Sequence, residues 1–382
     1  MASSNKPAKP VHILFVGAGA VGCFYASRLH HPSQNIYTSL IARSNYKAIA
    51  AAGKVELQTH SFGNYAFAPY AVFPNIEAAA SNASSSSEKS PVTPPSEGWD
   101  YIIVTTKALP DRTDDAALIA PLVSEKSCLV LIQNGVGVEE PYRARFPRNP
   151  IVSAVTVISA EQIRNGVIRQ NRWTRISLGP YGHGLSAPST SSSTSTNADE
   201  QVSEVTRLSH ERMQSLAHWW TVLGGIRDVE THTELELQTI RWHKLCINAA
   251  FNPTAVLSGG RGNADQLTDS ELREHVLGIM NEIRDAAPLV LGAPFPDTLA
   301  TPEKIIKSTE RNTGGRPSML LDWEAGRPME IEVILGNPVR IARAKGVEMP
   351  RLQTDTLKVW YITRTCVYIV RCTAYLWPLA CL

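Results

Sequence analysis

Short apolar runs separated by polar and glycine-containing segments characterise the first half of the chain. Runs of this length that are rich in β-branched residues predict buried strands of an α/β sheet. After about residue 203 the apolar spacing becomes typical of helices, in segments around Trp219, Leu245, Leu277 and Leu335. We therefore expect an α/β N-terminal domain followed by an all-α C-terminal domain. The predicted strands are residues 13–16, 36–43, 100–105, 128–132 and 176–179.

The first predicted strand leads directly into a glycine-rich turn, Gly17-Ala18-Gly19-Ala20-Val21-Gly22. A G-x-G-x-x-G spacing between a strand and a helix-compatible segment is typical of a Rossmann-type dinucleotide-binding unit. There Gly17 permits the tight turn, Gly19 lets the backbone approach the pyrophosphate, and Gly22 lets the helix pack closely on the strand. The helix N-terminus binds the phosphates through its free N–H groups. The competing interpretation is a glycine-rich turn that holds no cofactor.

The second predicted strand ends in Ala42-Arg43-Ser44, where NAD-binding units usually carry an acidic residue that bonds the ribose 2′-hydroxyl. A guanidinium at this position pairs with a 2′-phosphate, and the missing carboxylate removes a repulsive charge. The sequence therefore favours NADPH over NADH. The competing interpretation of Arg43 is a solvated surface residue.

Polar residues also follow the next two predicted strands. Lys107 comes after residues 100–105, and Asn134 comes after residues 128–132. Ligands of open α/β sheets bind beyond the carboxyl ends of the strands, so both residues are candidate cofactor contacts. Lys107 is expected to reach a phosphate or ribose, and Asn134 to orient the nicotinamide or the substrate. The alternatives are a solvated loop lysine and an ordinary Asn-Gly turn.

A stripe of polar residues marks the otherwise apolar segment RWHKLCINAAFNP. Lys244, Asn248 and Asn252 are each four residues apart, so a helix places them on one face. Pro253 follows, and we expect the helix to end or kink at Asn252. A lysine whose pKa falls on burial, beside two carboxamides, suits a site that binds a small polar substrate and protonates it. The competing interpretation is the polar edge of a half-exposed helix.

Composition narrows the class of protein. The 382 residues are enough for two domains, and a net charge of +2 gives no electrostatic signature of nucleic acid or membrane binding. The six cysteines are scattered without C-x-x-C or metal-ligand spacing, so we expect a reduced, intracellular enzyme without a metal. The first ten residues lack the apolar core of a secretory signal. The expected location is the cytoplasm, with mitochondria as the alternative.

Three segments depart from this two-domain pattern. Residues 81–97 and 185–200 are rich in Ser, Thr and Pro, and we expect them to be flexible surface loops. Residues 358–382 form an atypical tail, for which a divergent or mis-spliced end is favoured over an extra helix or strand. A membrane anchor is least favoured, because Arg364 and Arg371 would each cost about 2.5 kcal/mol or more at a helix centre. The predicted domains are residues 11–203 and 204–357, followed by this tail.

Five motifs in order, GAGAVG, VTTKA, QNGVG, KLCINAAFNPTA and RPSMLLDWEAGRPMEIE, resemble those of the ketopantoate reductase (2-dehydropantoate 2-reductase) family. The resemblance implies an N-terminal Rossmann domain, a helical C-terminal domain, and reduction of 2-dehydropantoate to (R)-pantoate with NADPH. That reaction belongs to the route to pantothenate and coenzyme A. A paralogue acting on another 2-oxoacid and a non-catalytic NADP(H) sensor remain as alternatives. The sequence is compatible with a homodimer and names no partner beyond the 2-oxoacid.

The resemblance also assigns site residues. It implies that Lys244 is the catalytic proton donor, and that Glu330 either accepts a hydrogen bond from the substrate 4-hydroxyl or holds Lys244 in place. A proline stands where the family has the first serine of its SSM motif, and the alternative for Ser318 is a helix cap. The alternative for Glu330 is a surface carboxylate on a helix. The residues implied to bind substrate are Asn248, Asn252, Ser318 and, with a weaker motif match, Asn263.

Overall fold

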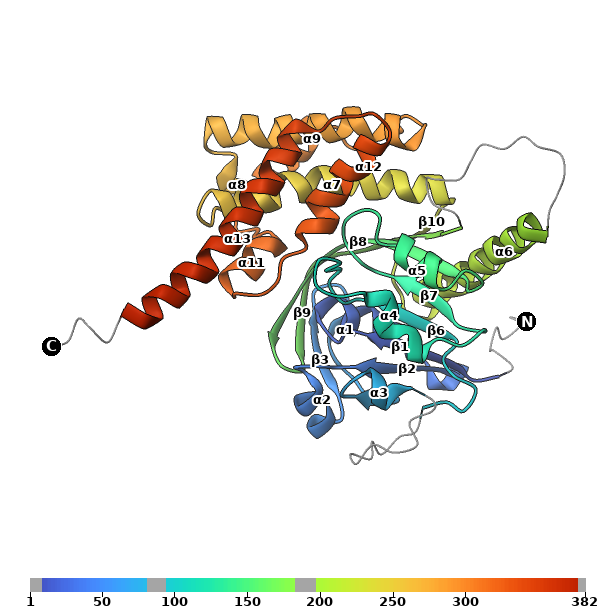
Figure 1. Cartoon of the computed structure of the whole chain (residues 1–382). Coiled ribbons are helices and arrows are strands. Elements are labelled where there is room, and N and C mark those ends of the chain that lie inside the picture. The colour runs from blue at the N-terminus through green and yellow to red at the C-terminus, as the bar shows by residue number, and fades with distance from the viewer. Residues whose placement is uncertain (1–8, 81–93, 183–196, 377–382) are drawn as a thin grey trace. The chain divides into compact units, whose positions relative to one another are not determined.

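The computed structural model describes residues 9–80, 94–182 and 197–376, and it contains two compact units (Figure 1). The first unit comprises the chain up to residue 108 together with residues 113–133 and 138–237. The second comprises residues 109–112, 134–137 and 238 to the C-terminus. Most of the predicted Ser-rich loops, at 81–97 and 185–200, lies outside the described residues.

A mixed sheet of ten strands forms the centre of the first unit, in the order β4-β3-β9-β8-β7-β6-β1-β2-β5, with β10 paired to β9. The pairs β3–β4 and β8–β9 are antiparallel, and the other pairs are parallel. The predicted α/β fold is confirmed. The strands are β1 (Val11–Val16), β2 (Ile36–Ile41), β3 (Val55–Thr59), β4 (Gly63–Phe67), β5 (Val72–Phe73), β6 (Tyr101–Val104), β7 (Cys128–Leu131), β8 (Ile151–Arg164), β9 (Val167–Pro180) and β10 (Val229–Thr231).

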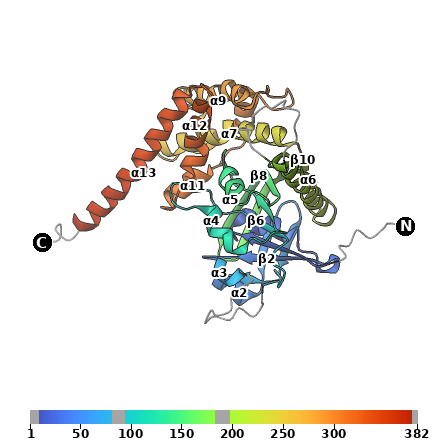
Figure 2. The ribbon, with the colours of Figure 1, turned by 45° about the vertical axis from the view of Figure 1, so that its right-hand side comes forward.

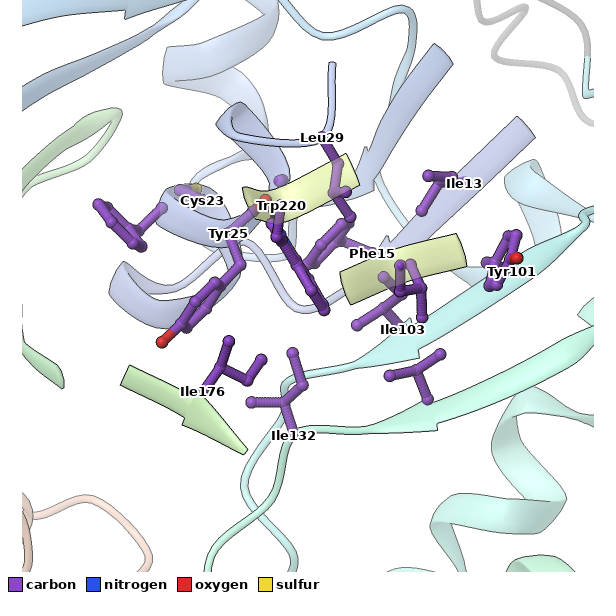
Figure 3. Packing of buried hydrophobic residues seen from close by; sticks show 14 of the residues in the cluster. Ile13, Phe15, Cys23, Tyr25, Leu29, Tyr101, Ile103, Ile132, Ile176 and Trp220 are labelled. Carbon is purple, nitrogen blue, oxygen red and sulfur yellow. Dashed lines mark hydrogen bonds between the residues drawn. The ribbon is translucent and has the colours of Figure 1, made fainter. Parts of the chain in front are cut away.

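Helices cover the sheet and bury its apolar faces. Figure 3 shows Tyr25 of the first helix and Trp220 in one apolar cluster with Ile176 of β9, and the two aromatic rings pack edge to face at 5.6 Å. Tyr25 also donates through its hydroxyl to the Arg175 carbonyl, which fixes this helix on β9. The helices are α1 (Ala20–Ser27), α2 (Tyr46–Ala52), α3 (Ile76–Ala79), α4 (Asp115–Ile119), α5 (Glu140–Arg145) and α6 (Asn197–His218), with a π-helical turn at Trp219–Leu223.

The long hairpin of β8 and β9 is the main feature of the sheet that the predicted strands do not include. Only residues 176–179 were expected to be a strand here, whereas each strand of the hairpin has 14 residues. The turn contains Asn165-Gly166, with Gly166 at φ +76°, and Trp173 forms a bulge at φ +51°. Because β8 runs parallel to β7 and continues past its end, the hairpin reaches beyond the carboxyl edge of the neighbouring strands.

The second unit is helical, as predicted (Figure 2). Its longest helices are α7, α9 and α13, and α7 continues through Pro253 to Leu257, so the helix does not end at Asn252. Pro253 removes one N–H from the helix, but the surrounding residues are buried and Thr254 Oγ1 donates to the Ala250 carbonyl. The helices are α7 (Glu234–Leu257), α8 (Asn263–Gln266), α9 (Ser270–Leu291), α10 (Pro302–Glu310), α11 (Ser318–Glu324), α12 (Asn337–Ala344) and α13 (Pro350–Leu376), with a π-helical turn at Glu332–Gly336.

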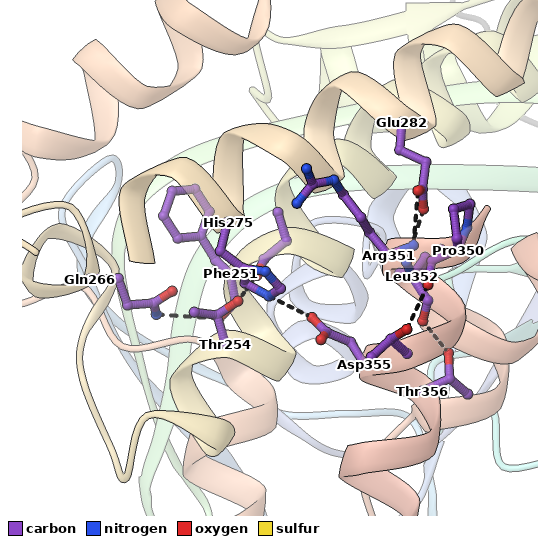
Figure 4. Close-up of polar contacts among 12 residues, drawn as sticks. Phe251, Thr254, Gln266, His275, Glu282, Pro350, Arg351, Leu352, Asp355 and Thr356 are labelled. Carbon is purple, nitrogen blue, oxygen red and sulfur yellow. Dashed lines mark hydrogen bonds and ion pairs between the residues drawn. The ribbon is translucent and has the colours of Figure 1, made fainter. Parts of the chain in front are cut away.

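Helix α13 is fixed to α9 near its start and includes much of the predicted tail. Glu282 accepts the backbone N–H groups of Arg351 and Leu352, and His275 contacts the fully buried Asp355 at 2.9 Å (Figure 4). Of the interpretations of the tail offered by the sequence, an extra helix agrees with the backbone from residue 358 to residue 376. Residues 377–382 lie outside the described residues. Within the described residues we find no helix whose length and hydropathy would allow it to span a bilayer.

The division between the units differs from the predicted boundary between residues 203 and 204. It lies between Leu237 and Gln238, within the first turns of α7. The reason is that α6 and β10 pack on the α/β sheet: Met213 and Leu216 of α6 belong to its apolar cluster, and β10 pairs with β9. Helical spacing alone does not reveal which unit a helix packs against.

Candidate functional site

The glycine-rich turn joins the end of β1 to α1 and is held by the neighbouring strand. Gly17 adopts φ +115°, and its carbonyl accepts a hydrogen bond from Thr105 Oγ1 at 2.7 Å. A Cβ on Gly22 would lie 2.0 Å from the Gly17 carbonyl oxygen, so only glycine fits there. At Gly19 a Cβ would meet no atom within 4 Å, which leaves open space beside the backbone. Ala20 begins α1 and Val21 follows it, at the helix N-terminus.

Arg43 follows β2 as an exposed residue, and the loop that carries it is connected to the glycine-rich turn. The amide nitrogen of the buried Asn45 donates to the Ala18 carbonyl at 2.6 Å and to Gln162 Oε1 at 2.7 Å. In the β8–β9 hairpin, Asn165 donates to the Ser44 carbonyl. The hairpin therefore supports the loop of Arg43, a connection that the strand pattern did not predict.

A polar network lies beyond the carboxyl ends of β6 and β7 in the first unit. Gln133 donates to the Thr106 carbonyl at 3.1 Å and to Asp115 Oδ2 at 3.2 Å. Burial raises the pKa of Asp115, while its hydrogen bonds and the charge of Arg43 act in the opposite direction. Lys107 is partly buried on the same β6 loop.

In the second unit, three residues far apart in the sequence form one hydrogen-bonded chain. Lys244 Nζ of α7 donates to Asn134 Oδ1 at 2.8 Å, and Asn134 Nδ2 donates to Glu330 Oε2 at 3.1 Å. Glu330 is 7% exposed and immediately precedes the turn of helix that begins at Ile331, so it is not a surface carboxylate on a helix. The structure thus brings together Lys244, Asn134 and Glu330.

The surroundings of Lys244 make its amine less basic than that of an ordinary lysine. Burial lowers the pKa of the Lys244 ammonium from its ordinary value of 10.5 to about 8, and the positive charge of Arg241 acts in the same direction. The Glu330 carboxylate opposes both effects. An ammonium group with this pKa donates a proton readily near neutral pH.

The remaining candidate substrate residues occupy different environments. Asn248 lies partly buried one turn after Lys244, and Asn252 is 4% exposed and accepts the Met319 N–H of α11 at 3.4 Å. Ser318 is the exposed first residue of α11, where Pro317 holds the cap position, so its side chain does not cap the helix. Asn263 begins α8, and its N–H donates to the Gly315 carbonyl. The structure thus connects the start of α11 to Asn252 and the start of α8 to the loop that precedes α11.

Arg241 and Asn337 contact the same loop as Lys244 and were not found from the sequence. Arg241 Nη1 donates to the Gly135 carbonyl at 3.0 Å, and Asn337 Nδ2 donates to the Val136 carbonyl at 2.9 Å. A second cation three residues before Lys244, in an apolar helix, was a signal for Arg241. Asn337 follows a π-helical turn, and the sequence carries no comparable signal for it.

Comparison with known proteins gives matches in both units. Residues 13–183 match the family model described as "Ketopantoate reductase PanE/ApbA". Residues 236–356 match the model described as "Ketopantoate reductase PanE/ApbA C terminal". The second match begins close to the division between the structural units.

Individual relatives align over most of the chain. A 2-dehydropantoate 2-reductase of Nostoc sp. is 25% identical over 338 residues, which cover 88% of this chain and 90% of that protein. An uncharacterized protein of Saccharomyces cerevisiae is 26% identical over 366 residues, with coverage of 89% and 90%. The crystal structure of 2-dehydropantoate 2-reductase from Methylococcus capsulatus superposes with a TM-score of 0.70 and 30% identity, over 92% of this chain and 96% of that one.

Proposed function

Because the chain belongs to the ketopantoate reductase family of nicotinamide-dependent oxidoreductases, we propose that it reduces 2-dehydropantoate to (R)-pantoate with NADPH. The observation that carries the proposal is the hydrogen-bonded chain of Lys244, Asn134 and Glu330. It combines a partly buried ammonium group, whose pKa is lowered to about 8, with the amide that orients it and a carboxylate. A sensor that only binds nucleotide has no need of such a proton donor.

The residues of the glycine-rich turn suit a dinucleotide. The open space beside Gly19 lets a pyrophosphate approach the backbone, and the N-terminal N–H groups of α1 can bind its oxygens. Arg43 would pair with the 2′-phosphate, and Lys107 would contact a phosphate or ribose. Bound NADPH would supply the hydride that adds to C2 of the 2-oxoacid.

Lys244 then serves as the proton donor. As hydride reaches C2, negative charge develops on the carbonyl oxygen, and the ammonium group stabilises this charge and transfers a proton to it. The amine left behind regains its proton from solvent, so each turnover consumes one NADPH and one proton. Asn134 directs the Lys244 amine through the 2.8 Å hydrogen bond, and Glu330 keeps the amide in that orientation.

Polar side chains of the second unit would select the substrate. Glu330 can accept a hydrogen bond from the 4-hydroxyl of 2-dehydropantoate, while Asn248, Asn252, Ser318 and Asn263 can bind its carboxylate and hydroxyl groups. The proline at position 317 leaves this region with one hydroxyl fewer than the SSM motif of the family. A related 2-oxoacid is therefore the second candidate substrate.

The test is NADPH oxidation by the purified full chain with 2-dehydropantoate and a panel of 2-oxoacids with and without a 4-hydroxyl. We expect the highest kcat/KM for 2-dehydropantoate and (R)-pantoate as the product on chiral chromatography. A higher kcat/KM for an acid without the hydroxyl would assign the second candidate. No reduction of any 2-oxoacid would refute the proposal.

A further inference from the structure

Two side chains of α7 hold neighbouring residues of one loop. Arg241 and Lys244 are three residues apart and therefore lie on the same face of the helix. Lys244 binds the Asn134 side chain at 2.8 Å, and Arg241 binds the next carbonyl along the chain, that of Gly135, at 3.0 Å. The side chain and the backbone of the loop are thus fixed by one rigid element.

The loop is also held by the π-helical turn and by α12. Val136 donates its N–H to the Val333 carbonyl at 2.9 Å, and Asn337 donates to the Val136 carbonyl at 2.9 Å. Gly135 packs so closely that a Cβ on it would lie 2.2 Å from the Val333 carbonyl oxygen. Small shifts of this loop therefore break hydrogen bonds or create overlaps.

Arg241 is unusual because its guanidinium is buried next to another cation. The residue is 3% exposed, and its charge lowers the pKa of Lys244. Burying a guanidinium beside an ammonium group is unfavourable unless its hydrogen bonds compensate. Lysine would be a poor replacement, because it lacks the planar fork that binds a carbonyl in a fixed orientation.

We propose that Arg241 is a positioning residue of the reductase, which fixes the loop of Asn134 against Lys244 through its hydrogen bond to the Gly135 carbonyl. This inference deepens the proposed function and rests on it. Arg241 acts through Asn134 and Lys244 and needs no contact with substrate. Its two effects, geometric and electrostatic, are separable by substitution.

The experiment compares three variants by kcat, by the pH dependence of kcat/KM, and by NADPH affinity. Arg241→Met removes both the hydrogen bond and the charge. Asn337→Ala removes a different hydrogen bond to the same loop without removing a charge. Arg284→Met is the matched control, because it removes one arginine charge from α9 of the same unit, where the guanidinium packs on Phe295.

Arg241→Met should lower kcat about 10- to 100-fold, the scale of a misplaced catalytic group, and leave NADPH affinity unchanged. In its profile of kcat/KM against pH, the loss of activity at alkaline pH should occur at a pH higher than about 8, because the charge that lowers the pKa of Lys244 is gone. Asn337→Ala should lower kcat without raising the pH at which kcat/KM falls. Arg284→Met should keep the parental kcat and the parental pH profile. If Arg241→Met does not fold, Arg241→Lys is used in its place. Because lysine keeps the positive charge but lacks the planar fork, we expect a lower kcat and the parental profile of kcat/KM against pH.

A folded Arg241→Met variant with parental kcat and pH profile would overturn the inference, as would equal changes in Arg284→Met. The pH dependence of folding stability, which can be measured without any enzymatic activity, separates this outcome from failure of the proposed function. Between about pH 8 and 10.5, unfolded Lys244 holds a proton that the folded chain has lost, so the parent should gain stability relative to Lys244→Met. That gain should shrink in the Arg241→Met background, and an unchanged gain would refute the electrostatic role even in a protein that reduces no 2-oxoacid.

Discussion

Replacing Gly135 by alanine should uncouple the loop of residues 134–137 from its support while leaving the fold intact. Gly135 has φ +83°, and the added Cβ would lie 2.2 Å from the Val333 carbonyl oxygen. Ordinary contact begins at 3.4 Å, so the loop must move by about 1 Å. It cannot slide freely, because the adjacent Val136 N–H binds the same carbonyl.

The expected cost has two parts. The left-handed backbone conformation costs alanine about 1–2 kcal/mol of stability. A 1 Å displacement of Asn134 from Lys244 should lower kcat by about 100-fold, since proton transfer depends on that orientation. NADPH affinity should not change, because the glycine-rich turn belongs to the first unit.

Gly346→Ala is the matched control. Gly346 lies in the same unit at φ +75°, and a Cβ there would meet nothing within 4 Å. Gly346→Ala should therefore have a lower melting temperature, because of the backbone strain, and keep the parental kcat. Steady-state kinetics, NADPH binding and thermal unfolding of both variants decide the matter. Equal kcat for Gly135→Ala and Gly346→Ala would refute the reasoning that the crowding at Val333 positions Asn134.

Further predictions concern the proton donor, the carboxylate and the cofactor. Lys244→Ala should lower turnover at least about 100-fold with NADPH affinity nearly intact, and near-parental turnover would remove Lys244 from the mechanism. Glu330→Gln should move the alkaline limb of kcat/KM below pH 8, because the lost carboxylate had raised the pKa of Lys244. The same variant should raise KM for 2-dehydropantoate more than for a 2-oxoacid without the 4-hydroxyl; equal losses would limit Glu330 to orienting Lys244. Arg43→Asp should weaken NADPH binding selectively, and an unchanged NADPH/NADH preference in fluorescence titrations would contradict the role of Arg43.

Central strands were predictable because burial on both faces leaves near-continuous apolar runs, as in β1 and β6. The β8–β9 hairpin was harder to find, because the far half of β8 has no buried residue and therefore no apolar run, although Asn165-Gly166 is a strong turn signal. The bulge at Trp173 has no sequence signature at all. Pro253 suggested a helix end, but tertiary packing of its neighbours kept the helix intact.

For the candidate site, the sequence identified residue types and spacing but not burial or partners. The four-residue spacing from Lys244 placed Asn248 and Asn252 on one helix, and the motif order pointed to Asn134 and Glu330. Direct contact between Asn134 and both Lys244 and Glu330 depends on packing between segments more than 100 residues apart, which no local pattern encodes. The side chain of Asn252 turned out to be buried against α11.

The assignment of residues 134–137 to the helical unit constrains how this chain can be recombined with its relatives. A chimera with a single junction near residue 237 would join a native QNGVG loop to foreign helices. That loop would then face replacements for Arg241, Val333 and Asn337, whose contacts with it are specific in hydrogen bonding and in space. A functional exchange must therefore transfer the short loop together with the helices, so that the helical unit is inherited as a discontinuous block.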